Sequence, residues 1–252
     1  MVYGNTVVPV SRGKASPAAP VAHVGRLLAD VTELLGRQLP AGCERALRTV
    51  PRHVFLPSRL WLRDGEGGYR PCDLSTDPDG WLTAAYTDTP LVTRFTDGLP
   101  SPSASMPSMV LELGTGTGFN AALLCVLLGD DAVSTVELDP LLAVRGERNL
   151  QAAGFAPAVS CGDAAAGRPP GAPYERVVAT FSVDRVPTAW VEQTGAGGRI
   201  VTPWTSAWCR YGTLALTIGP GGTAHGRFHA FASFMPMQRP DQDTAGPAPA
   251  PH

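Results

Sequence analysis

A glycine-rich segment is the first feature of the sequence that could do chemistry. Gly114, Gly116 and Gly118 follow an apolar run that ends at Leu113, and a second apolar run begins at Phe119. Glycine lets main-chain amides approach a ligand without an intervening Cβ, and a helix that begins there turns its positive end toward the ligand. A dinucleotide-binding loop has two residues between its second and third glycines, whereas this one has a single residue there.

An acid accompanies this loop. Glu112 precedes the first glycine, where a carboxylate could favour an ammonium group. S-adenosylmethionine carries an ammonium and no pyrophosphate, so the loop need only pass close under its aminoacyl end. The spacing therefore favours an S-adenosylmethionine site over a dinucleotide site. The alternative is an ordinary tight turn between a strand and a helix.

Two more acids follow predicted strands. Glu137 comes about 20 residues after the last glycine, where a carboxylate can accept both ribose hydroxyls. Asp163 follows the next predicted strand and could accept from the adenine amino group. The alternatives are a solvated charge at the end of a strand for Glu137 and a turn acid for Asp163. The predicted cofactor-binding residues are Glu112, Gly114, Thr115, Gly116, Thr117, Gly118, Glu137, Leu138, Gly162, Asp163, Ala164 and Thr180.

Other kinds of site find little support. The five cysteines are an odd number without a Cys-x-x-Cys pair, and we expect reduced thiols and no metal. His225 and His229 lie four apart, but in a predicted hairpin, so they do not indicate a metal site. No Ser-His-Asp or Cys-His constellation can be nominated.

The elements that must position the cofactor residues alternate between strand and helix. Strands are expected at 109–113, 132–137, 158–161, 176–180 and 199–202, with one helix at 119–128 and a second that begins at Pro140 and ends just before Gly154. This alternation is typical of a parallel sheet with crossover helices. Segment 211–231 reads as a hairpin. We therefore predict an α/β, Rossmann-like class I methyltransferase fold: a doubly wound, mostly parallel sheet with a C-terminal antiparallel hairpin and an N-terminal helical cap.

The chain divides into four expected parts. Residues 1–20 and 239–252 are rich in Pro, Ala and Gly and are expected to be disordered. Segment 21–108 is expected to form a cap with helices at 24–35 and 43–49, becoming irregular from about Leu56. Segment 109–238 is the expected cofactor-binding domain.

Composition excludes several classes of partner. The formal net charge is -2 and the arginines are scattered, so no basic field indicates nucleic acid. No apolar run approaches the roughly 20 residues of a membrane-spanning helix, and no secretory signal is recognisable, so we expect a cytoplasmic protein. The oligomeric state stays open.

Several stretches in order resemble the protein-L-isoaspartate O-methyltransferase family, over about residues 42 to 205. They are Arg48 to Pro57, Ala85 to Leu91, Ser105 to Met109, the glycine loop, Gly162-Asp163 with Ala172 to Tyr174, Val186-Pro187, and Gln193 with Gly197 to Arg199. The resemblance implies methylation of an isoaspartyl carboxylate in a peptide or protein, giving an ester that collapses to a succinimide.

The closing segment resembles a divergent branch of that family. Trp204 to Met237, with Trp208 to Tyr211 and Phe234 to Met237, is similar to members that accompany ribosomally made peptide natural products, such as lanthipeptides and graspetides. This resemblance implies that an ordinary aspartate of a modified precursor peptide is methylated, leading to aspartimide. The partner is then a dedicated peptide.

The resemblance assigns Ser105 as the active-site serine that helps to position the acceptor. A carboxylate is its own nucleophile at neutral pH, so positioning does most of the catalysis. If 109–113 is a strand, however, Ser105 starts about 17 Å below the loop at roughly 3.3 Å per residue. Four extended residues reach at most about 14 Å. Either the strand begins later, or another residue serves, or turnover is impaired.

Three functions therefore compete. The leading one is a peptide carboxyl O-methyltransferase. The second is a catalytically weak protein of the same fold that binds cofactor or precursor peptide. The third, a dinucleotide oxidoreductase, is disfavoured by the glycine spacing.

Overall fold

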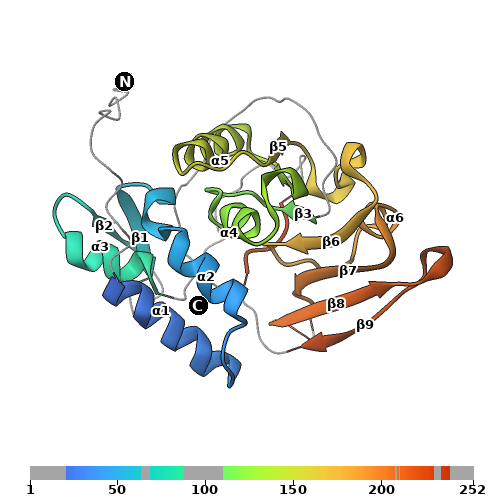
Figure 1. Cartoon of the computed structure of the whole chain (residues 1–252), viewed down its shortest axis with the longest axis horizontal. Helices are drawn as coiled ribbons and strands as arrows, with labels where there is room; N and C mark the ends of the chain where they lie inside the picture. The colour runs from blue at the N-terminus through green and yellow to red at the C-terminus, as the bar shows by residue number, and fades with distance from the viewer. Residues whose placement is uncertain are drawn as a thin grey trace, which may run out of the picture.

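The computed structural model describes residues 21–63, 69–87, 110–207, 209, 211–229 and 234–238. The predicted disordered ends, 1–20 and 239–252, lie outside these residues. Figure 1 shows two parts: a sheet with helices on both faces, and a smaller helical unit formed by the N-terminal part of the chain.

The larger part is built on a seven-stranded sheet with the order β5-β4-β3-β6-β7-β8-β9. Neighbours from β5 to β7 are parallel, and β8 and β9 each run antiparallel to the strand before. The predicted class I methyltransferase fold with its C-terminal hairpin is confirmed. The strands are β3 (Val110–Leu113), β4 (Val133–Glu137), β5 (Ala158–Cys161), β6 (Tyr174–Ala179), β7 (Thr194–Trp204), β8 (Gly212–Ile218) and β9 (Ala224–His229).

Helices cover both faces of the parallel strands. On one face, α4 (Phe119–Leu128) and α5 (Pro140–Ala152) connect β3, β4 and β5. On the other face, the buried Trp190 of α6 (Thr188–Glu192) packs in the cluster that contains Leu111 and Val177. Short 3-10 turns occupy Asp130–Ala132, Ala164–Ala166, Pro169–Gly171 and Pro220–Gly222.

Local sequence signals explain where α5 begins and ends. Asp139 accepts hydrogen bonds from the amides of Leu141 and Leu142 at 2.8 and 3.2 Å, and Pro140 takes the first helical position. Gly154 follows the end with a φ of 86°. Gly129, which follows α4, has a φ of 88° and a ψ of 153°, a conformation that favours glycine.

The N-terminal unit is more regular than its sequence indicates. The expected helices are α1 (Val21–Leu35) and α2 (Ala41–Thr49), followed by a 3-10 turn, Arg52–Phe55. The irregular stretch expected from Leu56 was wrong for the described residues, which form the hairpin β1 (Arg59–Arg63) with β2 (Tyr69–Asp73) and helix α3 (Pro78–Ala85).

Packing explains this difference. Leu60 and Trp81 are buried against the apolar side of α1 in one core cluster. Pro71 lies within β2 and masks the strand pattern, since proline cannot donate to a ladder. Asp77 caps α3 through the amide of Gly80 at 2.9 Å. In the part of the chain that the structure describes, no helix is long and apolar enough to cross a membrane.

Trp190 fastens the connection between β5 and β6 to the sheet. Its indole Nε1 donates to the main-chain oxygen of Ala164 at 2.7 Å, and the side chain is fully buried. We predict that Trp190→Phe lowers the free energy of unfolding by about 1–3 kcal/mol, because it removes a buried hydrogen bond and replaces a fully buried indole by a smaller ring. Urea unfolding measures this. Tyr211→Phe, at an exposed position, is the control, and equal stabilities of the two variants would contradict the prediction.

Candidate active site

The glycine loop lies at the carboxyl end of β3, between the two strands that flank it in the sheet. Gly114, Gly116 and Gly118 all have positive φ, at 95°, 56° and 92°. A Cβ on Gly114 would lie 2.4 Å from Thr180 Oγ1, and one on Gly118 would lie 2.9 Å from the main-chain oxygen of Gly146. Two of the three glycines are therefore required by packing within the protein itself.

Gly116 and Gly162 have open space instead. A Cβ built on either of them meets no atom within 4 Å. Both follow the carboxyl end of a parallel strand, at the edge where ligands bind in open α/β sheets. This free space, bordered by the carboxylates of Glu137 and Asp163, fits the polar, pyrophosphate-free S-adenosylmethionine.

The chain itself uses several of the loop amides. The amides of Gly114 and Thr115 donate to the main-chain oxygen of Val136 at 2.8 and 3.2 Å. The Gly116 amide donates to Glu137 Oε2 at 2.8 Å. These bonds fix the loop against β4, so the amides expected to face a ligand serve first to hold the loop's shape.

Glu112 lies beneath the loop with no exposed surface. Its Oε1 accepts from Asn120 Nδ2 at 2.8 Å, and its Oε2 accepts from the Thr135 hydroxyl at 2.6 Å. The Thr115 hydroxyl lies 2.6 Å from that of Thr135, which extends the network into the loop. Glu112 therefore stabilises the loop through these hydrogen bonds.

Burial also changes the acidity of this site. It raises the pKa of Glu112 to about 7, against the opposing effect of the Thr135 and Asn120 hydrogen bonds. The pKa of Glu137 is raised as well, again mainly by burial. Proximity of a second carboxylate disfavours ionisation, and Glu137 contributes to the raised pKa of Glu112 in this way.

Glu137 ends β4 at the position that the sequence predicts. Its second oxygen, Oε1, accepts from the amide of Asp139 at 3.1 Å, and the residue keeps 9% of its surface exposed. Each carboxylate oxygen has two lone pairs, so one main-chain donor on each leaves acceptor capacity for a ligand.

The remaining predicted residues lie along the same edge of the sheet. Asp163 Oδ1 caps a 3-10 turn through the amide of Ala165 at 2.8 Å, and the Leu138 main-chain oxygen accepts from Cys161 Sγ at 3.7 Å. Thr180 Oγ1 donates to the main-chain oxygen of Gly114 at 2.7 Å. The structure thus gathers these residues around the ends of β3, β4, β5 and β6.

Three further residues support the loop and were not predicted. Asn149 Nδ2 donates to the main-chain oxygens of Thr117 at 2.9 Å and Phe55 at 3.4 Å, joining the loop to the N-terminal unit. Gly146 lets α5 approach the loop, since its Cβ would lie 2.9 Å from the Gly116 oxygen. A glycine in the middle of a helix is the signal for it. Asn120 has the weaker signal of an amide in the first helical turn.

Ser105 lies outside the described residues, so its role remains a prediction. The strand that was expected to separate Ser105 from the glycine loop is confirmed as β3, which begins at Val110. Among the described residues no group of three or more His, Cys, Asp or Glu side chains could hold a metal ion.

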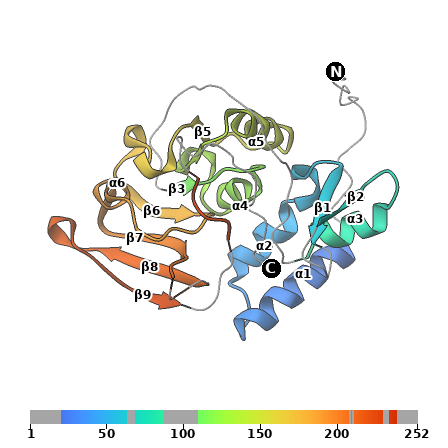
Figure 2. The same ribbon diagram turned by 180° about the vertical axis from the view of Figure 1, so that it is seen from behind.

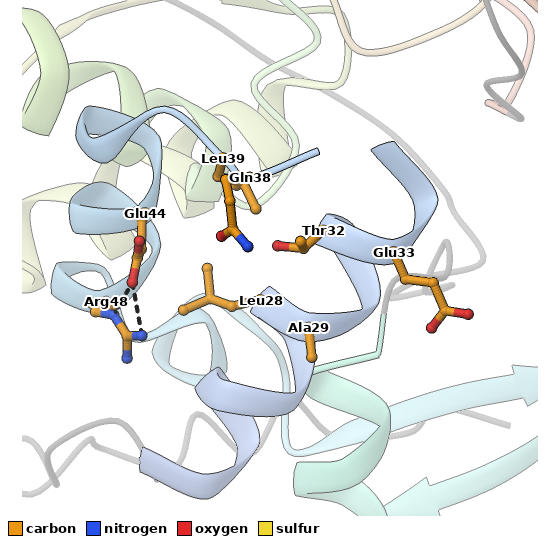
Figure 3. A pocket seen from close by; sticks show the side chains of 8 residues that line it. All are labelled: Leu28, Ala29, Thr32, Glu33, Gln38, Leu39, Glu44 and Arg48. Carbon is orange, nitrogen blue, oxygen red and sulfur yellow. Dashed lines mark hydrogen bonds and ion pairs between the residues drawn. The ribbon is translucent and has the colours of Figure 1, made fainter. Parts of the chain in front are cut away.

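A hollow elsewhere in the molecule is distinct from this site. Figure 3 shows it between α1 and α2, where Leu28, Leu39 and Thr32 line it and the ion pair of Glu44 with Arg48 lies at its side. All its lining residues come from segment 28–48. It therefore contains none of the predicted cofactor residues.

Comparison with known proteins identifies the family. The model of the family described as protein-L-isoaspartate(D-aspartate) O-methyltransferase matches residues 41–210. The chain belongs to this family. As a member, it is an S-adenosylmethionine-dependent methyltransferase, as the loop spacing predicts.

Individual relatives that are similar to this chain carry the same family name. A protein-L-isoaspartate O-methyltransferase of Halorhodospira halophila is 34% identical over 76% of this chain and 81% of its own length. One of Methanoculleus marisnigri is 35% identical over 69% of this chain and 75% of its own.

Two solved structures show the shared fold. A protein-L-isoaspartate O-methyltransferase matches with a TM-score of 0.59 at 22% identity, over 86% of this chain and 66% of that one. A Plasmodium falciparum structure in complex with S-adenosyl-L-homocysteine matches with a TM-score of 0.55 at 10% identity, over 86% and 98%.

The raised pKa of Glu112 predicts a pH-dependent stability. The folded chain keeps a proton on Glu112 that the unfolded chain loses between pH 4.5 and about 7, so the associated stability is present below pH 4.5 and is lost as the pH rises to about 7. Glu112→Gln mimics the protonated acid. Between about pH 4.5 and 8, the free energy of unfolding of the unmodified protein should decrease by on the order of 3 kcal/mol more than that of Glu112→Gln.

Urea unfolding across this pH range measures the difference. Glu147→Gln, at an exposed position of α5, is the matched control and should keep the pH profile of the unmodified protein. Parallel profiles for Glu112→Gln and the unmodified protein would show that Glu112 does not hold the proton.

Proposed function

We propose that this protein transfers the methyl group of S-adenosylmethionine to the side-chain or main-chain carboxylate of an aspartyl or isoaspartyl residue in a peptide or protein. The observation that carries the proposal is the open space over Gly116 and Gly162 beside two strand-end carboxylates. Family membership supplies the acceptor class. The methyl ester then leads to a succinimide by attack of a neighbouring main-chain amide.

The chain's own residues act by binding and orientation. The bound cofactor supplies a methyl group on a positively charged sulfur, and an ionised acceptor carboxylate needs no general base. Glu137 has acceptor capacity for ribose hydroxyls, and Asp163 Oδ2 is available to an adenine amino group. Glu112 holds the loop through Thr135 and Asn120. Fixing oxygen, carbon and sulfur in line accounts for the catalysis.

A dedicated precursor peptide is the acceptor that we favour within this class. The closing segment, whose sequence resembles the branch associated with peptide natural products, returns to the site. Ser182 donates from its amide to the Met235 oxygen at 2.8 Å and accepts from the Met237 amide at 2.8 Å. Phe234 and Met235 are 44% and 69% exposed. The segment that contains them pairs with Ser182, which lies two positions along the chain from Thr180. They offer an apolar surface to a peptide beside the acceptor position.

The second candidate function is binding of cofactor or precursor peptide with little turnover. It rests on the short connection between the serine motif and β3, which begins at Val110. Both functions require cofactor binding, so binding and turnover need separate measurements.

Cofactor binding is tested by thermal unfolding. S-adenosylmethionine and S-adenosylhomocysteine should raise the melting temperature, whereas nicotinamide dinucleotides should not. Gly162→Ala should weaken S-adenosylhomocysteine binding about tenfold without changing stability, because its Cβ enters space that is open in the protein alone.

Gly25→Ala is the matched control, since it adds the same methyl group in open space on α1. Stabilisation by dinucleotides but not by S-adenosylhomocysteine would overturn the cofactor assignment. Equal affinities in the two variants would place the ligand away from Gly162.

Turnover is tested with S-adenosylmethionine and matched aspartyl and isoaspartyl peptides, followed by mass analysis. We expect a mass gain of one methyl group, and then loss of methanol to the succinimide. A precursor-like aspartyl peptide should be preferred over the isoaspartyl one. If neither peptide gains a methyl group while S-adenosylhomocysteine still binds, the binding-only function replaces the enzymatic one.

A further inference from the structure

The four strands from β6 to β9 carry an unusual distribution of charge on one face. Register places Arg176 opposite Arg199 on β6 and β7, and Thr217 of β8 then links Arg199 to His225 of β9. In the next row, Val201 and Ala215 lead to Arg227. Side chains alternate along each strand, so these residues share a face. We call the set the basic face: Arg176, Arg199, His225, Arg227 and His229.

One acid lies in these strands, Glu175 of β6, directly before Arg176. Strands β7, β8 and β9 contain no Asp or Glu. All five residues of the basic face are exposed. The ion pairs of Glu44 with Arg48 and of Arg59 with Asp73 do not involve the basic face. Arg176 Nη1 donates instead to the main-chain oxygen of Glu175, the nearest acid in the chain, at 2.9 Å.

This arrangement has a cost for the fold. Arg176 and Arg199 are register partners on the neighbouring parallel strands β6 and β7, and their like charges repel each other. Charged side chains on β9 can be explained as protection of an edge strand, but Arg176 and Arg199 lie on interior strands. An anionic ligand would remove the repulsion between them.

The basic face is also open. In Figures 1 and 2, β8 and β9 extend beyond α4 and α5, and no helix of the described residues lies over them. His229 lies in the row of Pro203 and Thr213, near the carboxyl end of β7 and therefore on the edge where the cofactor residues lie. Arg199 is one strand spacing from β6 and in the row of Arg176, four residues before Thr180, whereas Arg227 is three strand spacings from β6 and two residues before the row of His229. With about 4.8 Å between strands and about 3.3 Å per residue, both lie roughly 14–16 Å from Thr180, a span of roughly four to six peptide residues.

We infer that the basic face docks an acidic segment of the peptide substrate while the acceptor residue occupies the site at the end of β6. This inference rests on the proposed function and specifies its substrate: a peptide with Asp or Glu residues about four to six positions from the acceptor. Acidic side chains there would pair with Arg199 and Arg227. The charge complementarity favours peptides of this composition over neutral ones.

Binding is measured without turnover, so the inference can fail separately from the proposed function. Two fluorescent twelve-residue peptides share one aspartyl acceptor and differ in three Glu that are replaced by Gln. With S-adenosylhomocysteine present, fluorescence anisotropy should show about tenfold tighter binding of the Glu peptide in low salt. Arg199→Glu with Arg227→Glu should remove this preference, as should salt of about 0.5 M.

The double variant Arg26→Glu with Arg148→Glu is the control, since it makes the same charge change on exposed positions of α1 and α5. It should retain the preference, and S-adenosylhomocysteine should bind equally to all three proteins, which shows that each is folded. Equal binding of both peptides to the unmodified protein would overturn the inference. So would tighter binding of a single-stranded oligonucleotide through the same arginines.

Discussion

The buried carboxyl group of Glu112 connects the elements that the site depends on. It lies on β3, accepts from Thr135 on β4 and Asn120 on α4, and reaches Thr115 of the loop through Thr135. Removing a carboxyl from water is costly unless it is hydrogen-bonded or protonated. Glu112 accepts two hydrogen bonds, and its burial favours the protonated form. The loop, two strands and the first crossover helix are thereby held in one arrangement.

The three glycines of the loop above this network have different roles. Gly114 and Gly118 allow Thr180 and α5 to approach the main chain closely, while Gly116 borders open space. Asn149 then joins the loop to the 3-10 turn of the N-terminal unit through Phe55. A cofactor bound on the loop is therefore linked mechanically to both parts of the molecule.

The parallel half and the antiparallel end of the sheet serve different purposes. Strands β3 to β6 gather the cofactor residues at their carboxyl ends, as expected for a doubly wound sheet. The hairpin of β8 and β9 extends the sheet beyond α4 and α5, where the basic face is exposed and available to a second molecule. In our proposals the first region holds the methyl donor and the second holds part of the peptide.

The sequence by itself determined the fold class, the cofactor class and the strand-end positions of Glu137, Asp163 and the loop. Each depends on a local pattern: apolar periodicity, glycine spacing or a capping residue such as Asp139. Only the tertiary structure decided that Glu112 is buried, that Asn149 joins two parts of the chain, and that residues from four strands form one basic face. These depend on strand order and register, because contacts between residues far apart in sequence leave no local pattern. The hairpin of β1 and β2 was missed for a related reason, since Pro71 conceals a strand that packing against α1 and α3 stabilises.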